Sequence, residues 1–479
     1  MNLPARSAAR LVLGPASRLR LRPRRSLLFL LTITIVLPLV VALSVAVVGD
    51  LKTLGLCIAL AVGLTILARP FYGITAFAAA LYIRPEEMIY SLRSLHLLEM
   101  LAVTSLLGWI AHLIVHRERP LRTPEITMIS CFGLVAILGS MRSGSALDAV
   151  DAIAKLVALV ILTLNLANTP ERYRALKATV IWCSAYLAAF SAFLYFTGGA
   201  MDEHGTFRSQ ATGIFSDPND LAAALTAGFA LCIPETLRGS TGRRATYAAL
   251  TVLIVFSIFL TGSRGGLLAF ITVLAGFGIC YTRHKVLAAV AAVTIGLGIV
   301  MLASAHMRDF DTQDASANSR FHFWENGIYL ATHNPVLGVG YGAFPALNEG
   351  YTAHNTFVLC LAELGVFGYF FFIGCLFYCY RNYPGWSAAE GEEEQAANDM
   401  RSSRLALTGY LAAAFWISRT YVPVLYLLAA LPVAAQLAYA ARSDMVKLSP
   451  RQTFRDYSSI GGICIGSIIF IFFLAHHFA

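Results

Sequence analysis

The sequence predicts an all-α, polytopic membrane protein with roughly 12–15 transmembrane helices and one periplasmic loop of about 50 residues. Three observations lead to this prediction. Hydrophobic residues make up 57% of the 479 residues and charged residues only 13%, about half the charged fraction of a soluble domain. Apolar segments of bilayer-spanning length recur along the chain. The charged residues gather in short stretches between those segments, which is typical of a membrane topology.

Fifteen apolar segments are candidates for membrane spans, and 71–83 and 405–417 are short for the purpose. The segments are 27–48, 51–67, 71–83, 92–115, 126–139, 147–167, 173–197, 213–237, 245–260, 266–281, 286–303, 356–380, 405–417, 422–441 and 458–474. They divide the chain into a basic cytoplasmic arm (1–26), transmembrane helices (27–305), a periplasmic loop (306–355) and C-terminal transmembrane helices (356–474), with a cytoplasmic loop near 381–404.

The distribution of basic residues sets the expected orientation. With the N-terminus in the cytoplasm and alternating sides, cytoplasmic segments hold 26 of the 36 lysines and arginines. The positive-inside rule favours this orientation. The formal charge of +9 therefore reflects topology, and we expect no nucleic-acid partner.

Two polar stretches interrupt the apolar pattern. The acidic one, 388–404, is interpreted as a solvated cytoplasmic loop. The other lies in the 306–355 loop, where Phe321, Trp324, Ile328 and Ala331 recur at helical spacing. That stripe predicts a short helix on the membrane surface, with Trp324 at the lipid interface.

Few basic residues fall on the expected periplasmic side, and four of them suggest a site: Arg208, Arg264, Arg320 and His354. Guanidinium groups bind phosphate oxygens bidentately and stay charged, so converging arginines suit a lipid-linked phosphate or diphosphate. Each could instead reach towards lipid headgroups.

Glycines accompany two of these positions. Gly265 and Gly266 follow Arg264 and would let the backbone approach a ligand, at a helix N-terminus that attracts anions. Gly338, Gly340 and Gly342 are interpreted as ordinary loop glycines.

Other charged residues fall in or near spans. Asp151 and Lys155 are four residues apart and should neutralise each other. Glu99 and Glu363 are each expected to pair with an arginine of another helix. The cysteines fall in apolar segments and the histidines have no metal-site spacing, so we expect no metal and no cofactor.

Five stretches in order resemble the O-antigen ligase and polysaccharide polymerase superfamily of bacterial inner-membrane glycosyltransferases. They are Gly213 to Asn219 (GIFSDPN), Gly262 to Gly266 (GSRGG), Arg320 with Trp324, His333 to Gly340 (HNPVLGVG), and His354-Asn355-Thr356 continuing to Glu363-Leu364-Gly365. These stretches span about a third of the chain, 206–370. The stretch 83–87 (IRPEE) is similar to the exosortase-associated O-antigen ligase-like subgroup. Many relatives carry Asn-Pro-Asn where this chain has Asp217-Pro218-Asn219.

The resemblance implies a multi-pass enzyme of the bacterial inner membrane whose active site faces the periplasm. It implies transfer of a glycan from undecaprenyl diphosphate to an acceptor hydroxyl on lipid A core, a growing glycan or a protein, without metal or nucleotide. Arg208 and Arg264, with Gly265 and Gly266, would bind the diphosphate. Arg320 would hold the diphosphate or orient the acceptor, and His354 would be the general base or position the hydroxyl. Asn219, Asn355 and Glu363 would support them.

Two alternatives stay open at this point. A repeat-unit polymerase shares the same motifs and differs from a ligase only in its acceptor. A lipid-linked glycan flippase or other transporter would also have many spans and basic residues, but transporters usually bind at the midplane of repeated halves. The depth of the basic residues would separate the transferase from the transporter.

Overall fold

The computed structural model describes residues 51–89, 93, 96–199, 207–237, 239–281, 290, 294, 311–381, 392–440 and 452–478. Helices dominate this part of the chain. They are α2 (Leu51–Ala68), α3 (Pro70–Ile83), α4 (Pro85–Met88), α5 (Leu97–His116), α6 (Pro124–Ser143), α7 (Ala146–Leu166), α8 (Pro170–Phe196), the 3₁₀ turn η2 (Gly213–Ser216), α9 (Pro218–Leu237), α10 (Thr241–Leu260), α11 (Arg264–Tyr281), α13 (Asp311–His333), the 3₁₀ turn η3 (Pro345–Leu347), α14 (Thr356–Tyr380), α15 (Glu392–Ala414), α16 (Pro423–Ala440) and α17 (Phe454–Phe478).

The chain is a multi-pass membrane protein, and the all-α prediction is confirmed for the described residues. Nine of their helices are long and apolar enough to cross a membrane: α5, α6, α8, α9, α10, α11, α14, α16 and α17. Thirteen of the fifteen predicted segments coincide with helices, although α2 and α3 have only short apolar parts and α7 and α15 carry more charge. The predicted segment 27–48 and nearly all of 286–303 lie outside the described residues.

Local sequence explains where several helices begin. Thr123 and Thr169 each precede a proline, and their hydroxyls accept hydrogen bonds from the amides of Ile126 (3.5 Å) and Arg172 (3.4 Å). Threonine caps satisfy an otherwise unpaired amide, and proline tolerates the first helical position because its missing N–H is not needed there.

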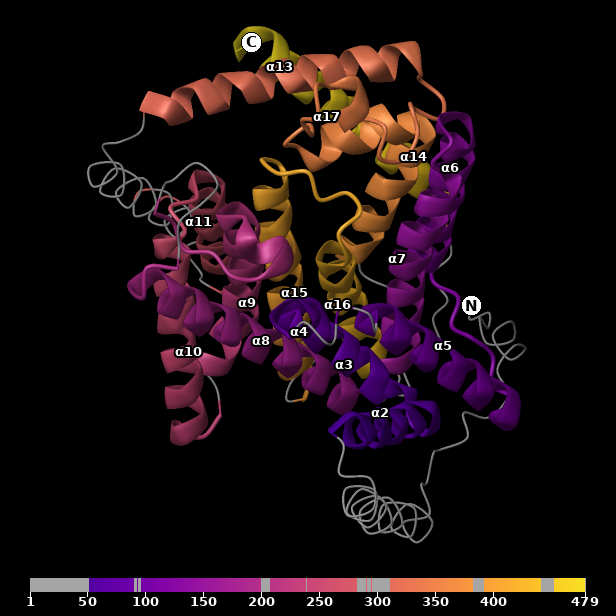
Figure 1. Cartoon of the computed structure of the whole chain (residues 1–479), viewed down its shortest axis with the longest axis vertical. Coiled ribbons are helices and arrows are strands. Elements are labelled where there is room, and N and C mark those ends of the chain that lie inside the picture. Colours follow the sequence, from indigo (N-terminus) through magenta and orange to yellow (C-terminus); the bar gives the residue numbers. More distant parts are fainter. Residues whose placement is uncertain are drawn as a thin grey trace, which may run out of the picture.

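The helices form a bundle in which α9, α14 and α16 are the most enclosed and α5, α10 and α17 have the most surface left open to lipid. Figure 1 shows α15 and α16 in the middle of the bundle and α13 lying across one end of it. We call this end, where α13 lies, the α13 end.

The predicted surface helix exists but packs differently from expectation. It extends over the whole of α13, which contacts α14 and α17. Trp324 is fully buried, with its ring centroid 5.4 Å from Phe415 and 5.9 Å from Trp416. The prediction that Trp324 sits at the lipid interface is therefore wrong, because the apolar stripe of α13 found a protein partner.

The prediction of a loop near 381–404 is also wrong for residues 392–404. Residues 392–404 form the first turns of α15, and Asp399 is only 2% exposed. Its carboxylate is bound by Lys177 Nζ (2.6 Å) and by the hydroxyl of Tyr439 (2.6 Å). Asp399 is buried because Lys177 of α8 and Tyr439 of α16 supply partners for it, whereas Glu394 of the acidic run is exposed.

These contacts belong to a closed ion network, by which we mean Lys177, Glu235, Arg243 and Asp399. Lys177 is 2% exposed and also binds Glu235 Oε1 at 2.7 Å, and Glu235 in turn binds Arg243. The network joins α8, α9, α10 and α15 at the end of the bundle opposite the α13 end. Each buried charge meets an opposite charge, as a stable interior requires.

Helix α14 is broken at Gly365, which has φ 63° and ψ −166°. The segment Pro335–Gly340 docks into the break. The amides of Val339 and Gly340 donate to the carbonyls of Ala362 (3.0 Å) and Glu363 (2.9 Å). A Cβ on Gly338 would lie 2.2 Å from the Glu363 carbonyl carbon, so only glycine allows this approach. Gly338 is therefore required for this segment to dock on α14, and its interpretation as an ordinary loop glycine is wrong.

Candidate functional site

Four chain segments meet at the α13 end of the bundle, each where a helix begins or ends. They precede α9, connect α10 to α11, precede α14, and connect α15 to α16. Hydrogen bonds tie them together. The Ser209 amide donates to the Leu260 carbonyl (3.0 Å), and the Arg419 amide donates to the Thr356 hydroxyl (2.9 Å). Thr420 donates its hydroxyl proton to the Thr356 carbonyl (2.8 Å).

The start of α9 is organised by Asp217-Pro218-Asn219. The carboxylate of Asp217 accepts from the amide (2.8 Å) and the side chain (2.9 Å) of Asn219, so Asp217 caps the helix. Asn219 Oδ1 in turn accepts from the Ser263 hydroxyl (2.7 Å) and from Arg208 (3.5 Å). The helix predicted from 213 begins only at Pro218, because Gly213–Ser216 forms a 3₁₀ turn.

Arg208 and Arg264 lie on either side of the α10–α11 turn. Arg208 is half-buried and donates from Nε to the Thr261 carbonyl at 2.9 Å. Arg264 is the first residue of α11 and is exposed. Asn219 and Ser263 therefore connect the two arginine-bearing segments to the start of α9.

The glycines after Arg264 have a packing explanation. A Cβ on Gly266 would lie 2.3 Å from the Cβ of Ala222, so glycine lets α11 pack closely on α9. Its amide donates to the Ser263 hydroxyl (3.0 Å), which caps α11. Gly265 is half-buried against the ring of Trp416. Gly266 is buried by α9, so its backbone is not open to a ligand as the sequence suggested.

Arg320 reaches this region from α13. Burial lowers the pKa of its guanidinium, and Arg208 and Arg264 lower it further because like charges disfavour one another. The negative charge of Asp217 raises the pKa of Arg320. The structure thus makes Arg208, Arg264 and Arg320 electrostatic neighbours, although Arg208 and Arg320 are 112 residues apart in the sequence.

His354 completes the group just before α14. Its backbone is left-handed (φ 48°), which is uncommon for a residue with a side chain, and the next residue, Asn355, caps α14 with its side-chain oxygen. Burial lowers the pKa of His354 to about 4, with Arg320 and Arg419 contributing and Asp217 opposing them. The imidazole is therefore neutral at neutral pH, and neutral imidazole can accept a proton.

Arg419 and Asp220 are part of the site that sequence reasoning missed. Arg419 makes a two-pronged ion pair with the 4%-exposed carboxylate of Asp220, and its Nη2 lies 3.9 Å from Asp217 Oδ2. The signal was present, because Arg419 is one of the few basic residues on the expected periplasmic side. We call Arg208, Arg264, Arg320, His354 and Arg419 the basic cluster.

Glu363 lies beneath the docked loop and not beside an arginine. It is 1% exposed, and its Oε1 accepts from the Phe344 amide at 3.1 Å. The expectation that Glu363 pairs with an arginine is wrong for the described structure, because the loop that docks at the break in α14 places the Phe344 amide beside its carboxylate. Glu363 and Asn355 therefore shape the segments that carry His354.

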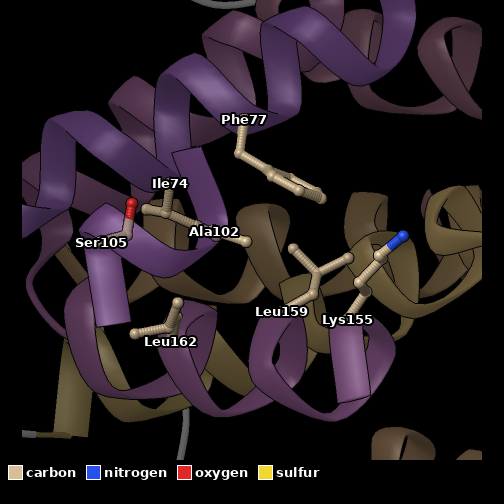
Figure 2. A pocket seen from close by; sticks show the side chains of 7 residues that line it. All are labelled: Ile74, Phe77, Ala102, Ser105, Lys155, Leu159 and Leu162. Atoms are coloured by element: carbon tan, nitrogen blue, oxygen red, sulfur yellow. The ribbon is translucent and has the colours of Figure 1, made fainter. Parts of the chain in front are cut away.

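The other charged residues of the spans pair among themselves. Lys155 Nζ binds Asp151 (2.8 Å), as predicted, and Glu99 (2.7 Å), whose expected partner was an arginine. Figure 2 shows Lys155 at the edge of an otherwise mostly apolar recess between α3, α5 and α7. None of the residues lining that recess belongs to the basic cluster.

No group of three or more His, Cys, Asp or Glu side chains in the described part of the chain is arranged to hold a metal ion. The chemistry available at the site is that of guanidinium groups, a neutral imidazole and two carboxylates.

Residues 249–373 match the O-antigen ligase family. The match runs from α10 into α14 and includes Arg264, Arg320 and His354, whereas Arg208 and Arg419 lie outside it. A comparison with curated proteins found no match. The chain is a membrane protein with an O-antigen ligase domain, and enzymes of this family are membrane glycosyltransferases that use lipid-linked glycans.

Proposed function

We propose that this protein is an O-antigen ligase-like glycosyltransferase of the bacterial inner membrane. It moves a glycan from undecaprenyl diphosphate to an acceptor hydroxyl at the periplasmic face. The observation that carries the proposal is the basic cluster, in which Arg320 has Arg208 and Arg264 as charged neighbours and itself neighbours the neutral His354, inside and next to the matched domain.

The arginines fit the donor's diphosphate. Like-charge crowding of Arg320 by Arg208 and Arg264 costs free energy in the empty site, and a bound anion relieves it. Arg208, Arg264, His354 and Arg419 lie at helix ends or between helices, where a diphosphate held at the headgroup level of a lipid carrier can reach them, and Arg320 joins them from α13. Guanidinium groups would also stabilise the charge that develops on the departing diphosphate.

The reaction needs one proton acceptor. The acceptor hydroxyl oxygen forms a bond to the anomeric carbon of the donor glycan, while the bond from that carbon to the diphosphate oxygen breaks. His354 takes the hydroxyl proton, and undecaprenyl diphosphate leaves with the bonding electrons. Since the diphosphate is already a good leaving group, the proposal includes no metal, cofactor or nucleotide.

The environment of His354 suits this order of events. In the free enzyme its pKa is about 4, chiefly because of burial and of Arg320. A bound diphosphate brings negative charge close to the imidazole and offsets the positive field of Arg320 and Arg419. The pKa of His354 then rises, so the base strengthens when the donor is in place.

A ligase is favoured over a polymerase by the likeness of 83–87 to the exosortase-associated subgroup. In the structure this stretch abuts the first motif, because the Glu87 carboxylate lies against Gly213. Lipid A core, a growing glycan or a protein would be the acceptor. A flippase or other transporter is less well supported, because no residue of the basic cluster lies in the middle of a candidate membrane span.

Transfer in vitro tests the proposal. The purified protein would be given its host's undecaprenyl-diphosphate-linked glycan and lipid A core, with EDTA present. We expect glycan-modified core, with the rate reduced roughly 10²- to 10⁴-fold by His354→Ala and unchanged by His333→Ala, an exposed histidine of α13. Longer lipid-linked glycan in place of modified core would identify a polymerase. No glycosyl transfer to any acceptor would overturn the proposal.

A further inference from the structure

Three rings form a stack that leads from the surface of the protein to His354. The rings of Phe323 and Tyr351 lie nearly parallel, with centroids 5.3 Å apart and an angle of 18°. Phe323 also faces His354 at 6.0 Å and 30°. Tyr351 is 55% exposed, so much of its ring remains open although Phe323 covers part of it.

The loop that carries Tyr351 is held firmly against α13. Asn326, one turn after Phe323, donates to Asn348 Oδ1 (2.8 Å), and Asn348 donates to the Tyr351 carbonyl (3.0 Å). The Tyr351 amide donates to the Asn348 carbonyl at 2.8 Å. These bonds hold the backbone of Tyr351, and the ring of Phe323 packs against its side chain, so part of the entropy cost of binding is met before any ligand arrives.

His354 has two kinds of neighbours. Its charged neighbours are Arg320, Arg419 and Asp217 of the diphosphate region. Its ring neighbour is Phe323, which leads outward to Tyr351. A hydroxyl that gives its proton to His354 must belong to a group lying beside the imidazole, and the aromatic stack is a surface on which that group can rest.

We propose that Tyr351, supported by the ring of Phe323, forms an aromatic platform for a sugar ring of the acceptor, which makes the acceptor a glycan and not a protein side chain. The inference rests on the function proposed above. The C–H face of a pyranose carries partial positive charge, and the face of an aromatic ring is negative, so the two pack favourably while the sugar hydroxyls remain at the edge. Since Phe323 lies between Tyr351 and His354, the hydroxyl that gives its proton to His354 would belong to a neighbouring sugar of the same glycan.

An aromatic side chain at the lipid interface is the competing explanation for an exposed tyrosine. Tyr329 offers the matched control, since it lies on the same helix, is 60% exposed and stacks on His333, away from the cluster. If both tyrosines only anchor the protein at the lipid interface, replacing either one should have the same effect. If Tyr351 is a sugar platform, only its replacement should weaken sugar binding.

The test is a binding titration on the full-length protein in lipid nanodiscs. The probes are the core oligosaccharide released from lipid A and the repeat-unit oligosaccharide released from the lipid carrier. We expect Tyr351→Ala to weaken binding of one of them roughly three- to tenfold, while Tyr351→Phe, which keeps the ring, and Tyr329→Ala bind as the wild type does. In the transfer assay, Tyr351→Ala should raise the acceptor KM and leave the donor KM unchanged.

Several results would overturn the platform. These are no binding of either oligosaccharide to the wild type, equal binding by Tyr351→Ala, equal losses in both tyrosine variants, a change confined to the donor KM, or transfer to a protein acceptor. Because binding is read without turnover, an inactive wild type that still binds sugar through Tyr351 would overturn the proposed function alone. An active enzyme whose sugar binding ignores Tyr351 would overturn the platform alone.

Discussion

The two ends of helix α9 hold charged groups arranged on opposite principles. Asp220 near its start faces the basic cluster, and Glu235, about 22 Å further along the helix, belongs to the closed ion network. In the network, opposite charges meet within the protein and Lys177 is 2% exposed. In the basic cluster Arg419 is paired with Asp220, but Arg208 and Arg264 carry the same charge as their neighbour Arg320, and Arg264 is exposed.

We infer from this difference that the ion network holds the fold and that the like-charged arginines bind an anionic ligand. A buried ion pair is self-sufficient, and removing one partner leaves a costly uncompensated charge. Crowded like charges raise the free energy of the empty protein and are useful only when an anion binds among them. The comparison predicts that mutations at the two ends will have opposite consequences for stability and activity.

The largest expected effect on stability is at the closed ion network. Lys177→Met leaves the carboxylates of Glu235 and Asp399 without their shared cation, and should destabilise the protein by about 3–5 kcal/mol. The measurement is the thermal unfolding midpoint of the purified protein in detergent. Lys155→Met, at a partly exposed ion pair, is the control and should change it little. Equal losses in the two variants would contradict the distinction.

At the basic cluster, Arg264→Gln should lower the transfer rate roughly 100-fold, because one guanidinium no longer stabilises the departing diphosphate. The unfolding midpoint should stay the same or rise, since a like charge next to Arg320 is gone. Transfer rate and unfolding midpoint are measured on one preparation. Loss of activity in parallel with loss of stability would show that Arg264 holds the fold.

The pH dependence of transfer sharpens the electrostatic side of the comparison. His354 acts as a neutral base and its pKa is about 4, so kcat/KM should stay level from pH 7 to about 5 and fall only near 4. Arg320→Gln removes a positive charge beside the imidazole, stabilises the imidazolium and should move this acid limb upward, towards 6.5. Burial is the larger cause of the low pKa, so the shift should be partial. A wild-type limb at 6.5 would contradict the assignment.

The smallest effect is expected where an ion pair is exposed. Asp151 is 68% exposed and pairs with Lys155 four residues further along α7. Asp151→Asn should change stability by less than about 0.5 kcal/mol and leave the transfer rate unchanged. Thermal unfolding and the transfer assay check both. A marked loss of transfer would give this ion pair a part in function that the comparison denies it.

Sequence reasoning located the segments of the site better than it located their contacts. Scarcity of basic residues on one side singled out Arg208, Arg264, Arg320 and His354, and the structure brings Arg320 close to each of the others. It missed Arg419 although the expected periplasmic position of this arginine was a signal, and it missed Asp220 because the pairing of the two joins residues 199 positions apart. No local pattern reveals such a partner.

The errors share a physical origin. Asp399 suggested a solvated loop because its partners, Lys177 and Tyr439, are on other helices. Trp324 suggested a lipid interface because the rings of Phe415 and Trp416 that bury it come from the end of α15. In both cases a polar or amphipathic residue was assigned to solvent or lipid, although the folded protein supplied a better neighbour.

Hydropathy and charge by themselves determined that this chain is a multi-pass helical membrane protein, because a backbone in lipid must satisfy its hydrogen bonds internally and long apolar runs do so as helices. The ordered motifs determined the kind of domain, which the match of 249–373 confirms. Only the tertiary structure decided the break in α14 at Gly365, the burial that keeps His354 neutral, and the pairing of Arg419 with Asp220. These features depend on which segments meet in space, and burial and Coulomb energies are set by those neighbours and not by sequence proximity.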